Sequence, residues 1–338
     1  MDTTENTPGQ EPGTRMTDAE LIDELVAVLD RDKKTLRKYR RHLEECSAWL
    51  AKEGKTLMTA RYRDLVRFLA YLASDQRVAK NSYGQMVKKT LGPSSRKSVI
   101  AALRAFYRHC IAMEYTERNP TAALETPSVA VKRGIMIGKK EIRHFLDALG
   151  RPRCRVQAYL FTFTAARLAS IAGLRWRDID FDGNLIHFDI AKAGASYSLP
   201  MHAELRAALL RWRSEQIDES ATNAAIAQAL QNEETAFVLL TRNGRAVAKT
   251  TLAKQLKWRA ARVNILAHAQ RPDKAGENKS KLSPHAIRRS VATMLRKEGK
   301  TLEDIADLLH QKDLNVTRKH YAFTDTPQLR KTVNELNF

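Results

Sequence analysis

Apolar residues recur at steps of three and four along the first third of the chain, which is the spacing of amphipathic helices. Leu21, Leu25 and Leu29 form the first stripe, behind a capping box made by Thr17 and Glu20. Similar stripes follow over residues 36–50, 65–72 and 99–110. The pattern predicts a bundle of four helices, with helical character throughout from residue 17 to about residue 124.

The rest of the chain mixes helical patterns with one strand region. Residues 126–138 lack helical periodicity and indicate an interdomain linker. Helices are expected at about 139–149, 202–217, 249–265, 285–298 and 301–309, together with a long apolar helix running through Leu160 and Arg167. Residues 185–200 predict strands that turn at Ala193 and Gly194 and end at Pro200. The polar segment 267–283 is expected to form a mobile loop. These patterns predict a mainly α fold with a small β-sheet in the C-terminal domain.

Charge is the outlying feature of the composition. The 338 residues include 58 Lys and Arg against 38 Asp and Glu, a net charge of +20. The excess is uneven, because residues 1–30 sum to −7 while residues 31–130 sum to +12. So strong a basic excess indicates a polyanionic partner, nucleic acid before a membrane surface. A hydrophobic content of 43% excludes wholesale disorder, although the Pro- and Gly-containing residues 1–16 predict a disordered tail.

Cysteine usage and hydropathy indicate the cellular compartment in which the protein works. Cys46, Cys110 and Cys154 are odd in number and far apart, so we expect neither a disulfide framework nor a structural zinc site. The first thirty residues are polar and acidic, unlike a signal peptide, and no window holds 18 uninterrupted apolar residues. A cytoplasmic, DNA-associated protein with no membrane partner is the expectation.

Four basic positions are candidates for phosphate chemistry. His285 and Arg288 lie three residues apart, so a helix aligns an imidazole with a guanidinium that can bind a phosphate. By itself, this motif fits a solvated helix face better. Arg167 falls inside the predicted apolar helix, where a buried arginine needs an anionic partner. The alternative for Arg167 is a structural ion pair with an acid such as Asp178. Lys192 is expected at the hairpin tip, where a lysine is usually only solvated.

Residues 301–321 admit two interpretations. Leu302, Ile305, Leu308 and Leu309, a polar break and a second helix form a pattern typical of a helix-turn-helix, in which Tyr321 packs. In the other interpretation Tyr321 is a reactive residue that follows the second helix. This segment alone leaves the choice open.

Taken in chain order, these residues resemble the motifs of a known protein family. The set comprises Ala-Ala-Arg167-Leu-Ala-Ser-Ile-Ala-Gly-Leu-Arg-Trp, a hairpin lysine, His285-x-x-Arg288, and Lys-Asp-Leu-Asn-Val-Thr leading to Tyr321. It resembles the tyrosine recombinases, the phage integrase family of site-specific DNA recombinases. The helical part is similar to the core-binding domain of that family, through Thr35-Leu-Arg-Lys-Tyr-Arg-Arg-His-Leu, Leu103-Arg-Ala-Phe-Tyr and Asn119-Pro120-Thr121. The resemblance covers residues 36–321.

The resemblance implies a domain plan and a reaction. Residues 17–125 would form the core-binding domain, 126–138 the linker and 139–326 the α+β catalytic domain. Residues 327–338 would form a helix that docks on a neighbouring subunit. The enzyme would recombine or integrate the DNA of mobile elements through a covalent 3′-phosphotyrosyl intermediate, without cofactor or metal. Its partners would be double-stranded DNA and further copies of itself, as a tetramer on two DNA sites. The implied catalytic residues are Arg167, Lys192, His285, Arg288, Gln311 and the nucleophile Tyr321.

Two departures from the family pattern keep other functions open. Ser170 stands where the family usually has an acid, and alignment on Leu308 and Leu309 places His310 at the usual glycine and Gln311 at the usual histidine. Gln311 can donate a hydrogen bond but cannot shuttle a proton. A non-catalytic DNA-binding protein, either a degenerate recombinase or a helix-turn-helix regulator, is therefore one alternative, and a relaxing type IB topoisomerase is another. A regulator needs neither a buried Arg167 nor Lys192, and a helical domain of about 110 residues suits site-specific binding better than relaxation.

Overall fold

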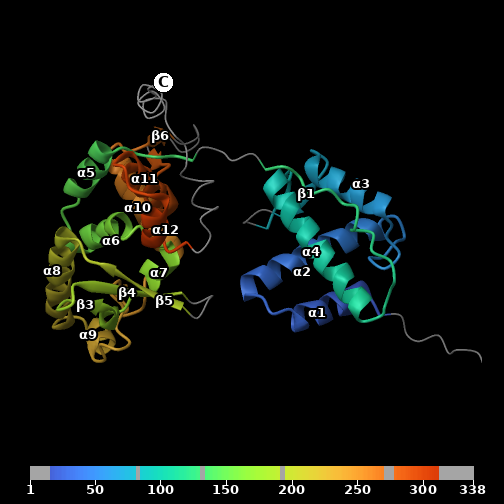
Figure 1. The fold of residues 1–338 in the computed structure, drawn as a ribbon. Helices are drawn as coiled ribbons and strands as arrows, with labels where there is room; N and C mark the ends of the chain where they lie inside the picture. The colour runs from blue at the N-terminus through green and yellow to red at the C-terminus, as the bar shows by residue number, and fades with distance from the viewer. Residues whose placement is uncertain (1–15, 81–83, 130–133, 191–194, 270–277, 312–338) are drawn as a thin grey trace, which may run out of the picture. The chain divides into compact units, whose positions relative to one another are not determined.

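The computed structural model describes residues 16–80, 84–129, 134–190, 195–269 and 278–311. The chain divides into two units, Met1–Ala130 and Val131–Phe338, each with its own hydrophobic core (Figure 1). The division falls within the segment 126–138 that was expected to be a linker. Residues 1–15 of the expected tail and the expected C-terminal helix, residues 327–338, lie outside the described residues.

Four amphipathic helices build the first unit, as the hydrophobic pattern predicted. They are α1 Asp18–Val28, α2 Lys33–Ala51, α3 Tyr62–Ala73 and α4 Pro93–Ala112. The predicted capping box begins α1, because the Glu20 amide donates to Thr17 Oγ1 (3.3 Å) and the Thr17 amide donates to Glu20 Oε2 (2.7 Å). The apolar stripes meet in one core that includes Leu25, Leu43, Phe68 and Phe106.

A small hairpin interrupts the helical bundle, so the expectation of helix throughout residues 17–124 was wrong here. Strands β1 Val78–Lys80 and β2 Met86–Lys88 pair antiparallel between α3 and α4. Three-residue strands are too short to show an alternating pattern in the sequence. Buried Arg77 fixes the base of the hairpin, since it donates from Nε to Glu45 on α2 (2.8 Å) and from Nη1 to the Lys89 carbonyl (2.7 Å).

The apolar helix α6 Pro152–Phe163 lies in the core of the second unit, and its residues 156–162 are all buried. Helix α6 packs against α5 Lys139–Asp147, α8 Ala203–Ser220 and α11 Pro284–Lys297. The other helices are α7 Leu168–Gly173, α9 Ala224–Leu230, α10 Lys249–Arg262 and α12 Leu302–Leu308, with a 3₁₀ turn at Trp176–Asp178. The predictions for 139–149, 202–217, 249–265, 285–298 and 301–309 are therefore confirmed, whereas α9 was not anticipated.

Two small sheets complete the second unit. Strands β3 Ile179–Asp180, β4 Leu185–Ile190 and β5 Ala195–Pro200 pair antiparallel in the order β3-β4-β5, which confirms the strand region 185–200 (Figure 1). The predicted turn residues Ala193 and Gly194 lie outside the described residues. Strands β6 Ala267–Ala269 and β7 Asn278–Ser280 also pair, so the expectation of a loop over 267–283 was wrong at both ends. The fold is mainly α with small β-sheets.

Candidate active site

Arg167 lies at a break between two helices, not inside one. Helix α6 ends at Phe163, and Ala165 then takes a left-handed backbone conformation (φ 47°). The Thr164 hydroxyl closes this turn by donating to the Leu160 carbonyl (2.6 Å). Arg167 is the N-cap residue of α7, and its side chain is exposed. The expectation of a buried arginine in a continuous apolar helix was therefore wrong, because the break turns the side chain out of the core.

Arg288 is the buried arginine of the site. It lies in α11, one turn after the Ser283 cap, and only 4% of its surface is exposed. Its Nη1 donates to the Ala165 carbonyl (2.6 Å) and its Nη2 donates to the Leu309 carbonyl (2.5 Å). One guanidinium thus connects the turn before Arg167 to the end of α12.

The turn after α12 reaches the other arginine. His310 has φ 44°, a conformation that glycine adopts most easily. Its carbonyl oxygen accepts a long hydrogen bond from Arg167 Nη2 (3.5 Å). The turns at Ala165 and His310, more than 140 residues apart, therefore lie close to both guanidinium groups.

His285 lies at the start of α11, and Gln311 follows the end of α12. His285 is exposed in the first turn of α11, with Nε2 3.3 Å from Arg289 Nη2. Gln311 is half-buried, and its backbone N–H donates to the Ala306 carbonyl (2.9 Å) at the end of α12. Lys192 and Tyr321, the predicted proton donor and nucleophile, lie outside the described residues. The structure thus places four of the six predicted site residues.

Tyr197 is a member of this cluster that the sequence analysis missed. It lies on β5, where its ring stacks on His310 (centroids 4.3 Å apart, planes at 7°) and on its cross-strand partner Phe188 (5.2 Å, 25°). Burial raises the pKa of the Tyr197 phenol, while Arg288, Arg167 and a hydrogen bond from Ser170 act in the opposite direction. The signal in the sequence was a tyrosine at an inward-facing position of a strand, since a buried phenol oxygen needs a polar partner.

The first unit offers a candidate nucleic-acid interface on α2. Lys34, Lys38 and Arg41 are exposed at steps of four and three, so they line one face of the helix, with Arg37 beside them. A cationic stripe of this kind suits contacts with phosphates, which dominate affinity for nucleic acid.

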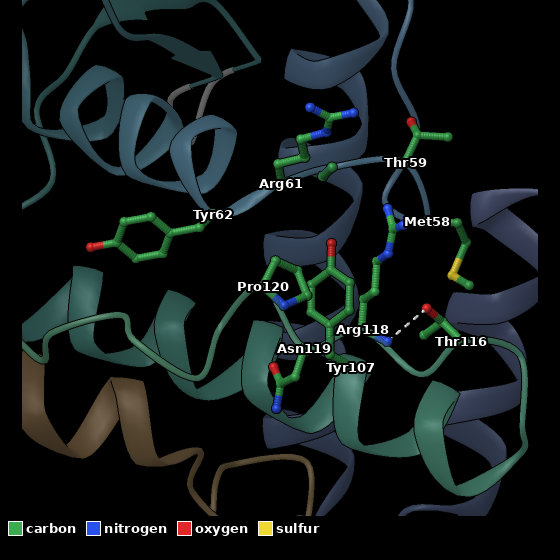
Figure 2. A pocket seen from close by; sticks show the side chains of 10 residues that line it. Met58, Thr59, Arg61, Tyr62, Tyr107, Thr116, Arg118, Asn119 and Pro120 are labelled. Carbon is green, nitrogen blue, oxygen red and sulfur yellow. Dashed lines mark hydrogen bonds between the residues drawn. The ribbon is translucent and has the colours of Figure 1, made fainter.

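A hollow of about 560 Å³ opens on the same unit, and Arg61 and Arg118 are among the side chains that line it (Figure 2). The Asn-Pro-Thr segment passes along it. Asn119 Oδ1 accepts from the amide (3.0 Å) and the hydroxyl (2.7 Å) of Thr121, which is buried. The Tyr107 hydroxyl donates to the Leu57 carbonyl (2.5 Å). The two contacts of Asn119 with Thr121 close a local turn in this segment.

The described ranges show neither a metal-ligand cluster nor a membrane-spanning helix. Within them, no group of three or more His, Cys, Asp or Glu side chains is placed to hold a metal ion. No described helix is both long enough and apolar enough to cross a bilayer.

Family models match both units of the chain. The model of the phage integrase family matches residues 136–326, and that of the phage integrase N-terminal SAM-like domain matches residues 22–113. Among curated relatives, the tyrosine recombinase XerC of Xanthomonas campestris pv. campestris (strain B100) is 23% identical over 301 residues, covering 88% of this chain and 80% of its own. The tyrosine recombinase XerD of Haemophilus ducreyi is 25% identical over 304 residues, covering 88% and 90%.

Solved structures share the fold at low sequence identity. The XerH site-specific recombinase bound to a palindromic difH substrate, in a post-cleavage complex, has a TM-score of 0.67 at 16% identity and covers 94% of this chain and 84% of its own. The Tn1549 transposon integrase in complex with transposon right end DNA has a TM-score of 0.66 at 14% identity and covers 94% and 99%. A lambda integrase tetramer bound to a Holliday junction has a TM-score of 0.61 at 15% identity and covers 92% and 80%.

Proposed function

This chain belongs to the phage integrase family, and on that premise we propose that it is a site-specific DNA recombinase that cuts and rejoins strands through a covalent 3′-phosphotyrosyl intermediate. The observation that carries the proposal is the meeting of Arg167 and Arg288 at the turns around Ala165 and His310. Two guanidinium groups brought together from distant segments suit a phosphate, because planar forks fit phosphate oxygens in two-bond geometry.

The proposed reaction begins with attack of the Tyr321 oxygen on the scissile phosphorus. The phenol loses its proton, a phosphotyrosyl bond forms and the bond to the 5′ oxygen breaks. The phosphorane-like transition state gains negative charge, which Arg167 and Arg288 stabilise as positioned cations. His285, exposed on the same helix as Arg288, hydrogen-bonds the phosphate and assists proton transfer.

Two further residues complete the reaction in this proposal. Lys192 protonates the departing 5′ hydroxyl, and Gln311 donates a hydrogen bond to a phosphate oxygen in place of the histidine usual in the family. The phosphotyrosyl bond conserves the energy of the broken phosphodiester. A 5′ hydroxyl from a second strand can therefore attack it and release Tyr321 without ATP, cofactor or metal.

The same proposal assigns roles to the larger parts of the chain. Residues 17–125 form the core-binding domain, which contacts double-stranded DNA through the α2 stripe, and residues 126–138 link it to the catalytic domain, residues 139–326. Four copies assemble on two DNA sites, with residues 327–338 docked on a neighbour, and the protein works in the cytoplasm on DNA. Support comes from the basic excess and from structural neighbours that are recombinases bound to DNA.

One departure favours a second candidate function. Because Gln311 cannot carry a proton, a relative that binds DNA without cleaving it fits this position as well. Covalent trapping separates the two functions. A duplex nicked next to the cleavage position loses a short fragment after attack, so the adduct cannot be religated. The recombinase proposal expects an SDS-resistant protein–DNA complex in a gel, and binding in a native gel without such a complex would favour the non-catalytic function.

A further inference from the structure

The turn at His310 holds both arginines of the candidate site through backbone carbonyls. Leu309 accepts from Arg288 Nη2 at 2.5 Å, and His310 accepts from Arg167 Nη2 at 3.5 Å. The direction of both guanidinium groups therefore depends on where this turn lies. The backbone of the turn is strained, because φ 44° at a non-glycine residue costs about 1 kcal/mol or more. Other contacts must therefore stabilise this conformation.

The ring of Tyr197 is placed to hold the turn. Its stack on the His310 imidazole is close and nearly parallel, with centroids 4.3 Å apart and planes at 7°. Tyr197 is itself fixed, because it lies on β5 in register with Phe188 on β4 and stacks on that ring. The sheet thus fixes the position of the Tyr197 ring, and the stack on that ring fixes the position of the His310 turn.

We propose that Tyr197 is a positioning residue for the reaction: by stacking on His310 it holds the turn whose carbonyls orient Arg167 and Arg288. The inference rests on the proposed recombinase function, since the arginines need precise orientation only if they bind a reacting phosphate.

Substitutions at Tyr197 separate the ring from the hydroxyl. Tyr197→Phe keeps the stack, so single-turnover cleavage of the nicked duplex should remain close to that of the unsubstituted chain. Tyr197→Leu removes the stack and should slow cleavage about 10-fold, the order expected for one aromatic pair. The dissociation constant for DNA should stay unchanged in both variants, because the basic stripe on α2 is untouched.

A second pair of variants distinguishes positioning from general loss of stability. In a His310→Gly background the stack is already absent and glycine tolerates the positive φ, so adding Tyr197→Leu should cause little further loss of rate. The matched control is another aromatic–imidazole stack in the same unit, Phe163 on His202 (4.2 Å, 8°). His202→Asn keeps a side chain able to cap α8 but removes that stack, and it should lower stability without slowing cleavage.

The stack also has a readout that does not need the reaction. In histidine-labelled protein, ring current from Tyr197 should shift the His310 ring protons upfield, and the shift should persist in Tyr197→Phe and vanish in Tyr197→Leu. A Tyr197→Leu variant that cleaves at the normal rate, or Tyr197→Leu and His310→Gly effects that simply multiply, overturns the inference. If the unsubstituted chain forms no adduct at all, the proposed function fails instead, and the shift alone decides whether the stack exists.

Discussion

At the scale of single residues, Arg167 and Arg288 carry the same charge in different environments. Arg288 is buried and donates to two carbonyls, whereas Arg167 is exposed. Arg288→Ala leaves both carbonyls unsatisfied and should lower the free energy of unfolding on the order of 3 kcal/mol. Arg167→Ala should change it by about 0.5 kcal/mol or less. If Arg167 were buried, Arg167→Ala would be expected to lose more stability than Arg288→Ala, which is the opposite order.

Both arginine variants should lose activity regardless of stability. Each removes a cation from the transition state, so single-turnover cleavage should slow by about 10²-fold or more. Urea unfolding and cleavage measured on the same preparations check both parts. Arg211→Ala, on an exposed face of α8, is the control that should alter neither. Normal cleavage by either variant would remove that arginine from the site.

Gln311 and His310 present a question of register that the same assay answers. His310 has the backbone conformation that suits the glycine usual in the family, which favours Gln311 at the histidine position. Gln311→Ala should therefore slow cleavage more than His310→Gly, because in the proposed reaction Gln311 contacts the phosphate while His310 only holds the turn. Gln311→His should cleave at the same rate or faster. If His310→Gly proves the more damaging change, His310 is the working residue.

At the scale of elements, α2 carries a buried histidine with a consequence for stability. His42 is 3% exposed, and neither ring nitrogen has a hydrogen-bond partner in the described part of the chain. Burial, together with Arg41 and Lys38, lowers the pKa of His42 to about 4. In the unfolded chain this histidine has its ordinary pKa, near 6.5. Between pH 6.5 and pH 4 the unfolded chain therefore binds a proton at His42 that the folded chain does not bind.

The sign of the pH effect follows from that difference in proton binding. The free energy of unfolding should be fully retained above pH 6.5 and should fall by up to about 3 kcal/mol as the pH drops from 6.5 to 4. His42→Leu should flatten this part of the profile in urea unfolding of the full chain. His144→Leu, at an exposed position on α5, should leave it unchanged. An equal slope in the His42→Leu protein would show that His42 does not titrate in this range.

The elements also show what the sequence could and could not predict. Helices with one buried stripe, such as α2 and α11, were predictable because their apolar residues recur at helical spacing. The break at Ala165 was not, because residues 156–166 are almost continuously apolar and a buried helix and a buried turn then look alike. The strands β1, β2, β6 and β7 have only three residues each, too few for alternation to register.

The site was predictable to a similar degree. Family-like spacing identified Arg288 and His285, and the structure places Arg288 against the turn before Arg167. Tyr197 has no motif of its own. Its role depends on which turn packs over β5, and that contact joins residues 113 positions apart. Long-range contacts of this kind cannot be found from periodicity.

At the scale of the whole molecule, the proposal requires copies of the chain to act together on two DNA sites. Residues 327–338 hold one apolar stripe, Leu329, Val333 and Leu336, on a segment too short to be a stable helix alone. Deleting them should leave binding to a single site intact but impair assembly of the two-site complex. Light scattering or native gels with paired DNA sites measure this. Full assembly by the truncated chain would rule out docking on a neighbour.

Tyr321 is the proposed nucleophile, and comparing the unsubstituted chain with Tyr321→Phe on the same nicked duplex tests this role. Removing one oxygen removes the attacking group and little else. We expect an SDS-resistant adduct that maps by mass spectrometry to the peptide containing Tyr321, no adduct with Tyr321→Phe, and nearly equal DNA affinity for both proteins. An adduct that persists in Tyr321→Phe would show that another residue makes the attack.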